Sequence, residues 1–469
     1  MKQGKFQEAI VLLDESIASY PDWYFPILLK GQANMKLKKF DVALRNFNDA
    51  LTLEIPTKDI PGVKYSIVQC YMSLKDYNKA IHAIDDLMPL VPASRKFDLL
   101  LNRGQSEMQI AKSSEGSGNN KKAQTFYSKA IVSFTEALKA PVGKKNHEIE
   151  AAFQKAYAQY KIGNAKGGIQ SLEKSIKAFE DVIERNKREE RAHKFLIDLS
   201  FRVAQSSAKS RQPTRYQETV SYIDRYLSIW PNKPEMMNKK GAALQGAKKY
   251  REAVEVFKLV TKLLPKDGTV YFSLGSCQMA AKQFAEAIGS FQKAIANGEK
   301  GNHNIYSFIA YCYQEQKQGC YNTDIPLYTN AVKILEQGVK NVSGQGKGKI
   351  QGDLQRKKDN LNILEENKST DNSNHMAAIT NVTKLERSID ANRDKLQRNQ
   401  ELYIRQPTEE LRLAIEEGKK AIREDEGSMQ NELEVLRRYV RESGKCGGQG
   451  TFDNYDKMRE VIKRHGSGS

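Results

Sequence analysis

The stretch that decides the fold is a pair of 34-residue segments. Residues 231–264 read PNKPEMMNKKGAALQGAKKYREAVEVFKLVTKLL, and residues 265–298 read PKDGTVYFSLGSCQMAAKQFAEAIGSFQKAIANG. Five kinds of position repeat at this offset, and they hold Pro231 and Pro265, Gly241 and Gly275, Tyr250 and Phe284, Ala253 and Ala287, and Phe257 and Phe291. Small residues let two helices touch, and the aromatic residues supply apolar area that one helical hairpin cannot bury alone. The pattern therefore predicts helical hairpins that stack on their neighbours.

A period of 34 residues with small, aromatic, small and aromatic positions and a closing proline resembles the tetratricopeptide repeat (TPR) family, whose unit is a helical hairpin. The same phase occurs near the start of the chain, where Phe6 and Ala9 precede Phe40 and Ala43 by 34 residues. The resemblance is strong over residues 1–92 and 231–298 and looser between them. It implies an all-α fold, a TPR-like α-solenoid superhelix of about eight or nine hairpins over residues 1–342. The residue spacing near the end of the chain adds a C-terminal helical (coiled-coil) hairpin to this fold.

Two departures from the regular period carry expectations of their own. Lys2 to Ile10 resembles the turn and second helix of a unit, so the first unit is expected to be truncated rather than to start on an unpaired helix. Gly104 and Ala130 are 26 residues apart where Gly241 and Ala253 are 12 apart, so about 14 residues are inserted. Long unstructured loops are uncommon in compact chains, and the inserted residues therefore predict longer helices.

The composition changes after residue 342. The glycine-rich run from Val342 to Gly352 predicts that residues 343–375 form a flexible linker with a short helix. Residues 376–442 are expected to form an antiparallel coiled-coil hairpin, because apolar and amide residues recur at spacings of three and four on both sides of Pro407. An intermolecular coiled coil, and thus self-association, is the competing interpretation. Residues 443–469 are expected to be a loop, a short helix and a flexible tail.

The formal net charge of +18 is concentrated on the repeats rather than on the residues after 343. A basic patch is predicted at Arg185, Lys187, Arg188, Arg191, Lys194, Arg202, Lys209, Arg211 and Arg215. Such a patch attracts an acidic partner surface, nucleic acid or an anionic membrane surface. The alternative interpretation is a solvated helix face, since Glu189 and Glu190 lie within the same stretch.

No motif for catalysis is present. The run from Gly344 to Lys349 lacks the spacing of a phosphate-binding loop, and the chain has no HExxH or Gly-x-Ser-x-Gly motif. The six histidines are far apart and the five cysteines are scattered, so we expect no catalytic residue, no metal and no cofactor. Few cysteines, odd in number, favour free thiols and a cytoplasmic protein, although an exported form with a Cys312–Cys320 disulfide stays open.

The resemblance implies binding in a concave groove lined by the first helix of each hairpin. Carried over by repeat phase, the groove candidates are Leu28, Gln32, Met35, Asn238, Ala242, Gln245, Phe272, Ser276, Met279, Ser307, Tyr311 and Gln314. Some of them are equally expected to pack within the superhelix. The clamp of Lys, Asn and Arg that holds a terminal carboxylate in chaperone-binding members of the family is missing, because Leu28, Tyr65 and Phe272 stand at its positions.

The sequence therefore predicts a non-enzymatic scaffold that binds a peptide or helix of another protein and helps to assemble a complex. The alternative function is a basic solenoid face that binds nucleic acid or an anionic membrane surface. A third possibility is that the C-terminal hairpin occupies the groove of its own chain and regulates access to it.

Overall fold

The computed structural model describes residues 3–141, 144–166, 168–447 and 452–465, and all regular structure in these ranges is helical. The chain divides into two compact units, Met1–Lys249 and Tyr250–Ser469. This division differs from the expected boundary at residue 342. The helices on either side of residue 342, α17 (Tyr321–Asn341) and α18 (Gly344–Arg405), pack directly on each other, so that the second unit continues without a break.

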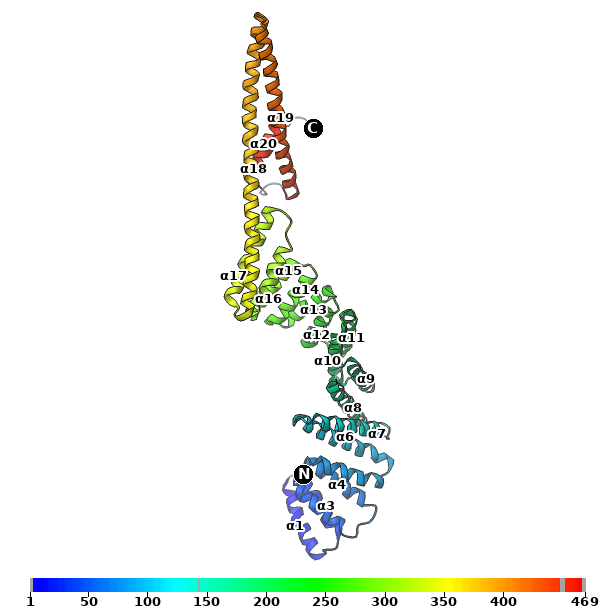
Figure 1. Cartoon of the computed structure of the whole chain (residues 1–469). Coiled ribbons are helices and arrows are strands. Elements are labelled where there is room, and N and C mark those ends of the chain that lie inside the picture. The colour runs from blue at the N-terminus through cyan, green and yellow to red at the C-terminus, as the bar shows by residue number, and fades with distance from the viewer. Residues whose placement is uncertain (1–2, 142–143, 167, 448–451, 466–469) are drawn as a thin grey trace. The chain divides into compact units, whose positions relative to one another are not determined.

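The first unit is a succession of helices in which each helix packs on the next (Figure 1). Its helices are α1 (Gln3–Ser19), α2 (Tyr24–Lys36), α3 (Phe40–Leu51), α4 (Ile60–Ser73), α5 (Tyr77–Leu87), the short 3₁₀ helix η1 (Met88–Leu90), α6 (Ala93–Gly116), α7 (Asn120–Ala137), α8 (Lys145–Lys166), α9 (Ile169–Arg185), α10 (Glu190–Ser206), α11 (Gln212–Ile229) and α12 (Pro234–Gly246). The expected α-solenoid of helical hairpins is thus confirmed.

The glycine position of the repeat brings the two helices of a hairpin into contact. A methyl group on Gly31 of α2 would lie 2.7 Å from the ring of Phe47 on α3. The same contact joins Gly104 on α6 to Phe134 on α7, at 2.6 Å. A side chain at the glycine would overlap the aromatic ring, which is why a small residue precedes a large one in each copy of the pattern.

The turn between the two helices of a hairpin uses a left-handed residue. Lys38 and Lys75 have φ values of 61° and 62°, and Gly118 has a φ of 77° at the corresponding point between α6 and α7. This conformation ends the first helix and reverses the chain within a few residues. It costs a lysine more than a glycine, so these lysines are held there by the packing of the two helices they connect.

The inserted residues lengthen helices, as predicted. α6 has 24 residues and α7 has 18, whereas α2 has 13 and α3 has 12. The extra turns of α6 continue the apolar pattern, since Met108 and Ala111 are buried in one cluster with Tyr127 of α7. The insertion therefore adds buried contacts between the two helices instead of a loop.

The second unit begins with the regular repeat and ends in a long hairpin. Its helices are α13 (Tyr250–Leu263), α14 (Gly268–Ala280), α15 (Phe284–Ala296), the 3₁₀ helix η2 (Glu299–Gly301), α16 (His303–Gln314), α17, α18, α19 (Glu409–Lys445) and α20 (Tyr455–His465). Gly275 of α14 contacts Phe291 of α15 in the manner of the first unit, with 2.8 Å between a methyl group added at the glycine and the ring.

The predicted flexible linker at residues 343–375 is wrong. α18 begins at Gly344 and continues without a break to Arg405. Ile350 is completely buried against Tyr306, Ala331 and Leu335 of the two preceding helices. A methyl group on Gly346 would lie 3.1 Å from the Cβ of His303, so this glycine permits close packing and is not a sign of flexibility. The start of α18 thus packs as the next helix of the repeat stack.

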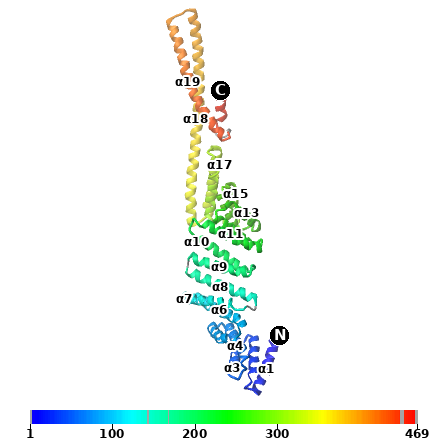
Figure 2. The same cartoon turned by 90° about the vertical axis from the view of Figure 1, so that its right-hand side faces the viewer.

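α18 and α19 lie side by side and run in opposite directions (Figures 1 and 2). Asn381 donates to Glu432 at 2.9 Å. Ser388, seven residues further along α18, donates to Asp425 at 2.7 Å. Asn392 also donates to Asp425 at 3.2 Å. The two halves of the predicted hairpin therefore pair within the chain, while a true coiled-coil geometry stays a prediction.

The C-terminal residues lie against the base of this hairpin. Met458 and Val461 of α20 are buried with Val382 of α18 and Leu436 of α19. Cys320, at the start of α17, forms a disulfide with Cys446, at the end of α19. The predictions of free thiols throughout and of a Cys312–Cys320 pair are both wrong, because α18 and α19 return the chain to α17 and so bring together two cysteines 126 residues apart. The other three, Cys70, Cys277 and Cys312, are buried free thiols, as expected for Cys277 and Cys312.

Candidate protein-interaction surfaces

The groove candidates fall on three positions of each first helix, defined relative to the small residue of the repeat. Three residues before it are Leu28, Asn238, Phe272 and Ser307. One residue after it are Gln32, Ala242, Ser276 and Tyr311. Four residues after it are Met35, Gln245, Met279 and Gln314.

The first and third of these positions are partly buried on every helix. Leu28 and Met35 pack against the cluster that contains Val63 and Ile67 of α4, the first helix of the next hairpin. Phe272 stacks on Phe308 of α16, with ring centroids 6.1 Å apart. These residues hold neighbouring first helices together, so much of their surface is unavailable to a partner.

The middle position is the accessible one. Gln32, Ala242 and Tyr311 are exposed, and Ser276 is half-buried with its hydroxyl bonded to the carbonyl oxygen of Phe272. Tyr311 is 45% exposed, which is uncommon for so large an aromatic side chain in a helix that is otherwise well packed. Among the twelve candidates, the residues at the middle position are therefore the most exposed to solvent, with Ser276 as the half-buried exception.

The end of the candidate surface is built by α18, a contribution that the sequence did not predict. Ser307 donates to the Asp353 carboxylate at 2.6 Å, and Lys357 donates to the amide oxygen of Gln314. Burial lowers the pKa of Lys357, whose side chain also lies near the ring of Tyr328. The signal that was overlooked is Ile350 with Leu354, an apolar pair at helical spacing within the glycine-rich run.

A polar pair recurs inside the hairpins, three residues after the glycine. Asn34 donates to Asn46 at 3.2 Å, and Ser290 donates to Gln278 at 2.6 Å. In the stretched hairpin of α6 and α7 the same place holds Glu107, which accepts from Ser133 at 2.7 Å. Glu107 is almost completely buried, and this burial raises the pKa of its carboxyl group. Because each pair is internal to a hairpin, we assign it to packing rather than to ligand binding.

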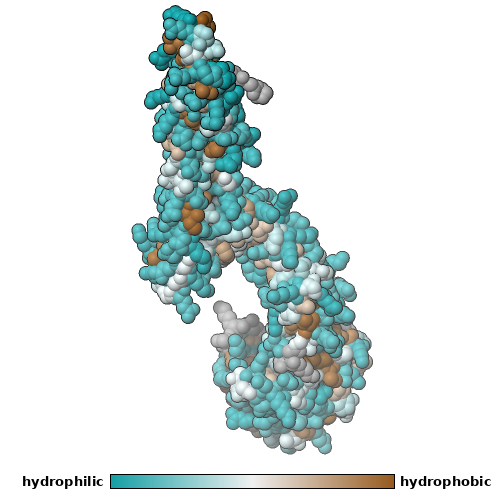
Figure 3. Space-filling model, turned by 45° about the horizontal axis from the view of Figure 1, so that its top comes forward, coloured by the Kyte–Doolittle hydropathy of each residue, from teal (hydrophilic) through white to brown (hydrophobic). Residues whose placement is uncertain are grey.

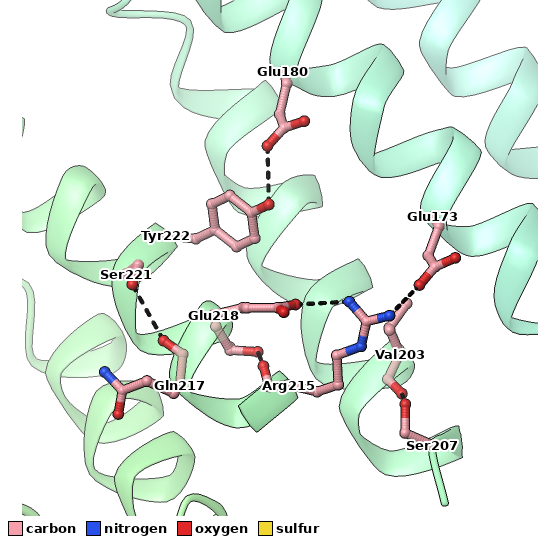
Figure 4. Close-up of polar contacts among 10 residues, drawn as sticks. Glu173, Glu180, Val203, Ser207, Arg215, Gln217, Glu218, Ser221 and Tyr222 are labelled. Carbon is pink, nitrogen blue, oxygen red and sulfur yellow. Dashed lines mark hydrogen bonds and ion pairs between the residues drawn. The ribbon is translucent and has the colours of Figure 1, made fainter. Parts of the chain in front are cut away.

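The predicted basic patch is largely neutralised within the fold. Arg215 of α11 binds Glu173 at 2.5 Å and Glu218 at 3.0 Å (Figure 4). Arg191 binds Glu150 at 2.9 Å and Glu189 at 2.7 Å.

The other bases of this stretch follow the same pattern. Arg185 pairs with Glu148 and Asp181, Lys194 pairs with Glu190, and Arg202 donates to Tyr160 and Asn164. Four bases make no ion pair with a described residue, and they are Lys187, Arg188, Lys209 and Arg211. Two of them lie in the turn before α10 and two lie in the turn before α11. Counting charges along the sequence overestimated the net positive charge of this patch, because several of its bases pair with acidic residues on other helices.

Two further properties of the described residues bear on function. No group of three or more His, Cys, Asp or Glu side chains in the described ranges is placed to hold a metal ion. None of the described helices combines the length and apolar character needed to cross a bilayer. The face shown in Figure 3 is mainly hydrophilic, with hydrophobic residues scattered singly or in small groups.

Comparisons with known proteins agree with the repeat. A comparison with curated proteins gives no match. Among solved structures, MamA 41-end from Desulfovibrio magneticus RS-1 is 18% identical over 39% of this chain and 94% of that one, with a TM-score of 0.31. YrrB, described as a TPR protein with an unusual peptide-binding site, is 13% identical over 45% of this chain and 97% of that one, with a TM-score of 0.33. A tetratricopeptide repeat protein from Parabacteroides merdae ATCC 43184 is 15% identical over 63% of this chain and 98% of that one, with a TM-score of 0.31.

The likenesses to solved structures are too distant to assign a ligand. The match to a family model is specific, since residues 238–302 match the model described as a tetratricopeptide repeat and contain both Gly241 and Gly275. Residues 238–302 are thus a tetratricopeptide repeat segment, and helical hairpins are repeated before and after it.

Proposed function

We propose that this protein is a non-enzymatic scaffold that binds a segment of another protein along the first helices of its repeats and helps to assemble a complex. A general role in protein binding is typical of tetratricopeptide repeats, and residues 238–302 match the model of that repeat. The single observation that supports the finer proposal is Tyr311, an exposed aromatic residue at the middle position of α16. Exposed aromatic side chains are enriched among the residues that dominate protein interfaces.

The neighbourhood of Tyr311 favours a partner of mixed character. Ser276 is its counterpart on α14, and Lys357 of α18 lies at Gln314, one turn further along α16. A helical or extended segment with an apolar anchor and an acidic or amide side chain fits these groups.

The test is a pair of charge substitutions on the full chain. Tyr311→Asp is expected to abolish co-purification of a saturable protein partner, because it places an uncompensated charge at the apolar anchor. Leu259→Asp is the matched control, since Leu259 is 49% exposed on α13, a second helix of a hairpin. Equal partner recovery with both variants, each with an unchanged circular dichroism spectrum, would refute the proposal.

The alternative function, binding of nucleic acid or an anionic membrane surface, is not proposed further. Ion pairs within the fold already neutralise four bases of the stretch, which are Arg185, Arg191, Lys194 and Arg215. Regulation of the groove by the C-terminal hairpin is also not favoured in its original form. α18 contacts the surface as a packed helix anchored by buried Ile350, which is a fixed boundary rather than a removable segment.

A further inference from the structure

A cavity of about 630 Å³ lies in the first unit, away from the groove positions of α2 and α12. Its walls are the first turns of α4 and α6 and the chain that joins α5 to α6 through η1. Small-molecule sites typically have volumes of about 300–1,000 Å³. The cavity is therefore large enough for a ligand of its own.

The floor of this cavity is apolar. Tyr65, Leu90 and Val91 supply its accessible apolar surface, and beneath them Leu87 and Leu99, which are 0% and 1% exposed, belong to a buried cluster with Val68 and Ile84. Tyr65 lines one side, and Leu90 lines the mouth with 46% of its surface exposed. A ligand with an apolar body would remove water from the exposed part of Leu90, which is favourable in proportion to the area covered.

The mouth of the cavity carries an uncompensated positive charge. Lys58 and Arg95 both line it, and neither forms an ion pair with any residue in the described ranges. Asp98 also lines it, but its carboxylate contacts the Nδ1 atom of His147 at 3.1 Å. Two cations and one carboxylate leave a net charge of about +1 at the mouth, which complements a monoanion.

We propose that this cavity binds a small amphipathic carboxylate, an aliphatic acid whose chain lies on Tyr65, Leu90 and Val91 and whose carboxylate meets Lys58 and Arg95. The apolar floor and the cationic mouth select opposite ends of such a molecule. The variants that test this site lie on or next to α4 and α6, whereas the variant that tests the proposed protein-binding surface is Tyr311 on α16, so one proposal can fail while the other stands.

The first experiment measures binding of decanoate to the full chain by titration calorimetry, below the concentration at which decanoate forms micelles. Decanoate is expected to bind with one-to-one stoichiometry, and decylammonium at least about tenfold more weakly because the mouth repels a cation. Equal affinities of the two compounds, or no saturable binding of decanoate, would overturn the proposal. A peptide with an apolar last residue and a free carboxylate that binds more tightly than decanoate would also overturn the assignment to a small molecule.

Two sets of variants locate the site. Gly62 lines the cavity, and a methyl group added there meets nothing within 4 Å, so Gly62→Phe fills the cavity without a clash at its Cβ. This variant is expected to lose decanoate binding. Gly289→Phe, at a helical glycine of α15 that is equally open, is the control and is expected to bind as the unmodified chain does. Retained binding in Gly62→Phe would place the ligand elsewhere.

The second set tests the charges at the mouth. Replacement of both Lys58 and Arg95 by glutamate is expected to weaken decanoate binding by about tenfold, the sum of two exposed ion pairs, while decanol binding is unchanged. Lys96→Glu, beside Arg95 but outside the cavity lining, is the matched control and should have little effect. An equal loss in the control would attribute the effect to net charge and refute the assigned contacts.

Discussion

Substitution of Gly275 by alanine tests the contact on which the repeat depends. A methyl group at this position would lie 2.8 Å from both Cδ1 and Cε1 of Phe291. The Phe291 side chain is fully buried and packs against Phe272 and Phe308, so its ring cannot simply rotate into solvent. The methyl group must therefore separate α14 from α15 or distort the cluster around them.

The expected magnitude follows from two opposing terms. Alanine is favoured over glycine within a helix by about 0.5–1 kcal/mol. Overpacking of a filled core costs about 1–3 kcal/mol. Gly289→Ala in the same hairpin gains the first term without the second, because nothing lies within 4 Å of the added methyl group. The two variants should therefore differ in the free energy of unfolding by about 1–3 kcal/mol, with Gly275→Ala the less stable.

Urea unfolding of the two variants, followed by circular dichroism at 222 nm, measures this difference directly. A second substitution, Phe291→Leu, removes the ring atoms nearest to the methyl group and should reduce the penalty of Gly275→Ala when the two are combined. If Gly275→Ala is as stable as Gly289→Ala, the close approach at the repeat glycine is not what holds the hairpin together, and the reasoning fails.

Two further predictions concern the base of the hairpin. His375 is fully buried between Tyr439 and Phe452, and its ring nitrogens have no hydrogen-bond partner among the described residues. Burial lowers the pKa of His375 below the ordinary value of about 6.5. As the pH falls through 6.5 the unfolded chain takes up a proton that the folded chain excludes, so the protection factors of the α20 amides, corrected for the intrinsic exchange rate, should fall below that pH and should fall less in His375→Phe. Loss of the Cys320–Cys446 disulfide, in Cys446→Ser or with a reductant, should lower the free energy of unfolding of the second unit by about 2–5 kcal/mol, and a urea midpoint unaffected by reductant would contradict this.

The regular repeats were predictable from the sequence because their determinants are local and recur. Gly275 indicates the close approach of two helices, and the residues inserted between Gly104 and Ala130 indicate longer helices. Each of these features is a residue type at a fixed spacing along one hairpin. The physical contact that explains it joins helices that are adjacent in the chain.

The features that the sequence did not predict depend on contacts between distant residues. The glycines from Gly344 to Gly352 indicated a linker, and only the burial of Ile350 on α16 and α17 makes a helix there. The sequence indicated that Arg215 is an unpaired base, whereas in the fold it donates to Glu173, which is 42 residues away in the chain. The groove candidates lie on first helices of hairpins, and the distinction between Tyr311, which is exposed, and Phe272, which is packed, depends on the neighbouring helix.

The continuity of α18 gives the second unit a mechanical property. At 1.5 Å per residue, its 62 residues span about 93 Å. No proline interrupts the helix, and its last glycine is Gly352, near the packed end. Beyond the repeats, α19 packs along most of the remaining length of α18. The pair of helices therefore forms a rigid spacer rather than a flexible linker. A molecule bound at the tip around Gln406 would lie at a fixed distance from the last repeat. A force applied at the tip would act through the rigid helix on the contacts of Asp353 and Lys357 with α16.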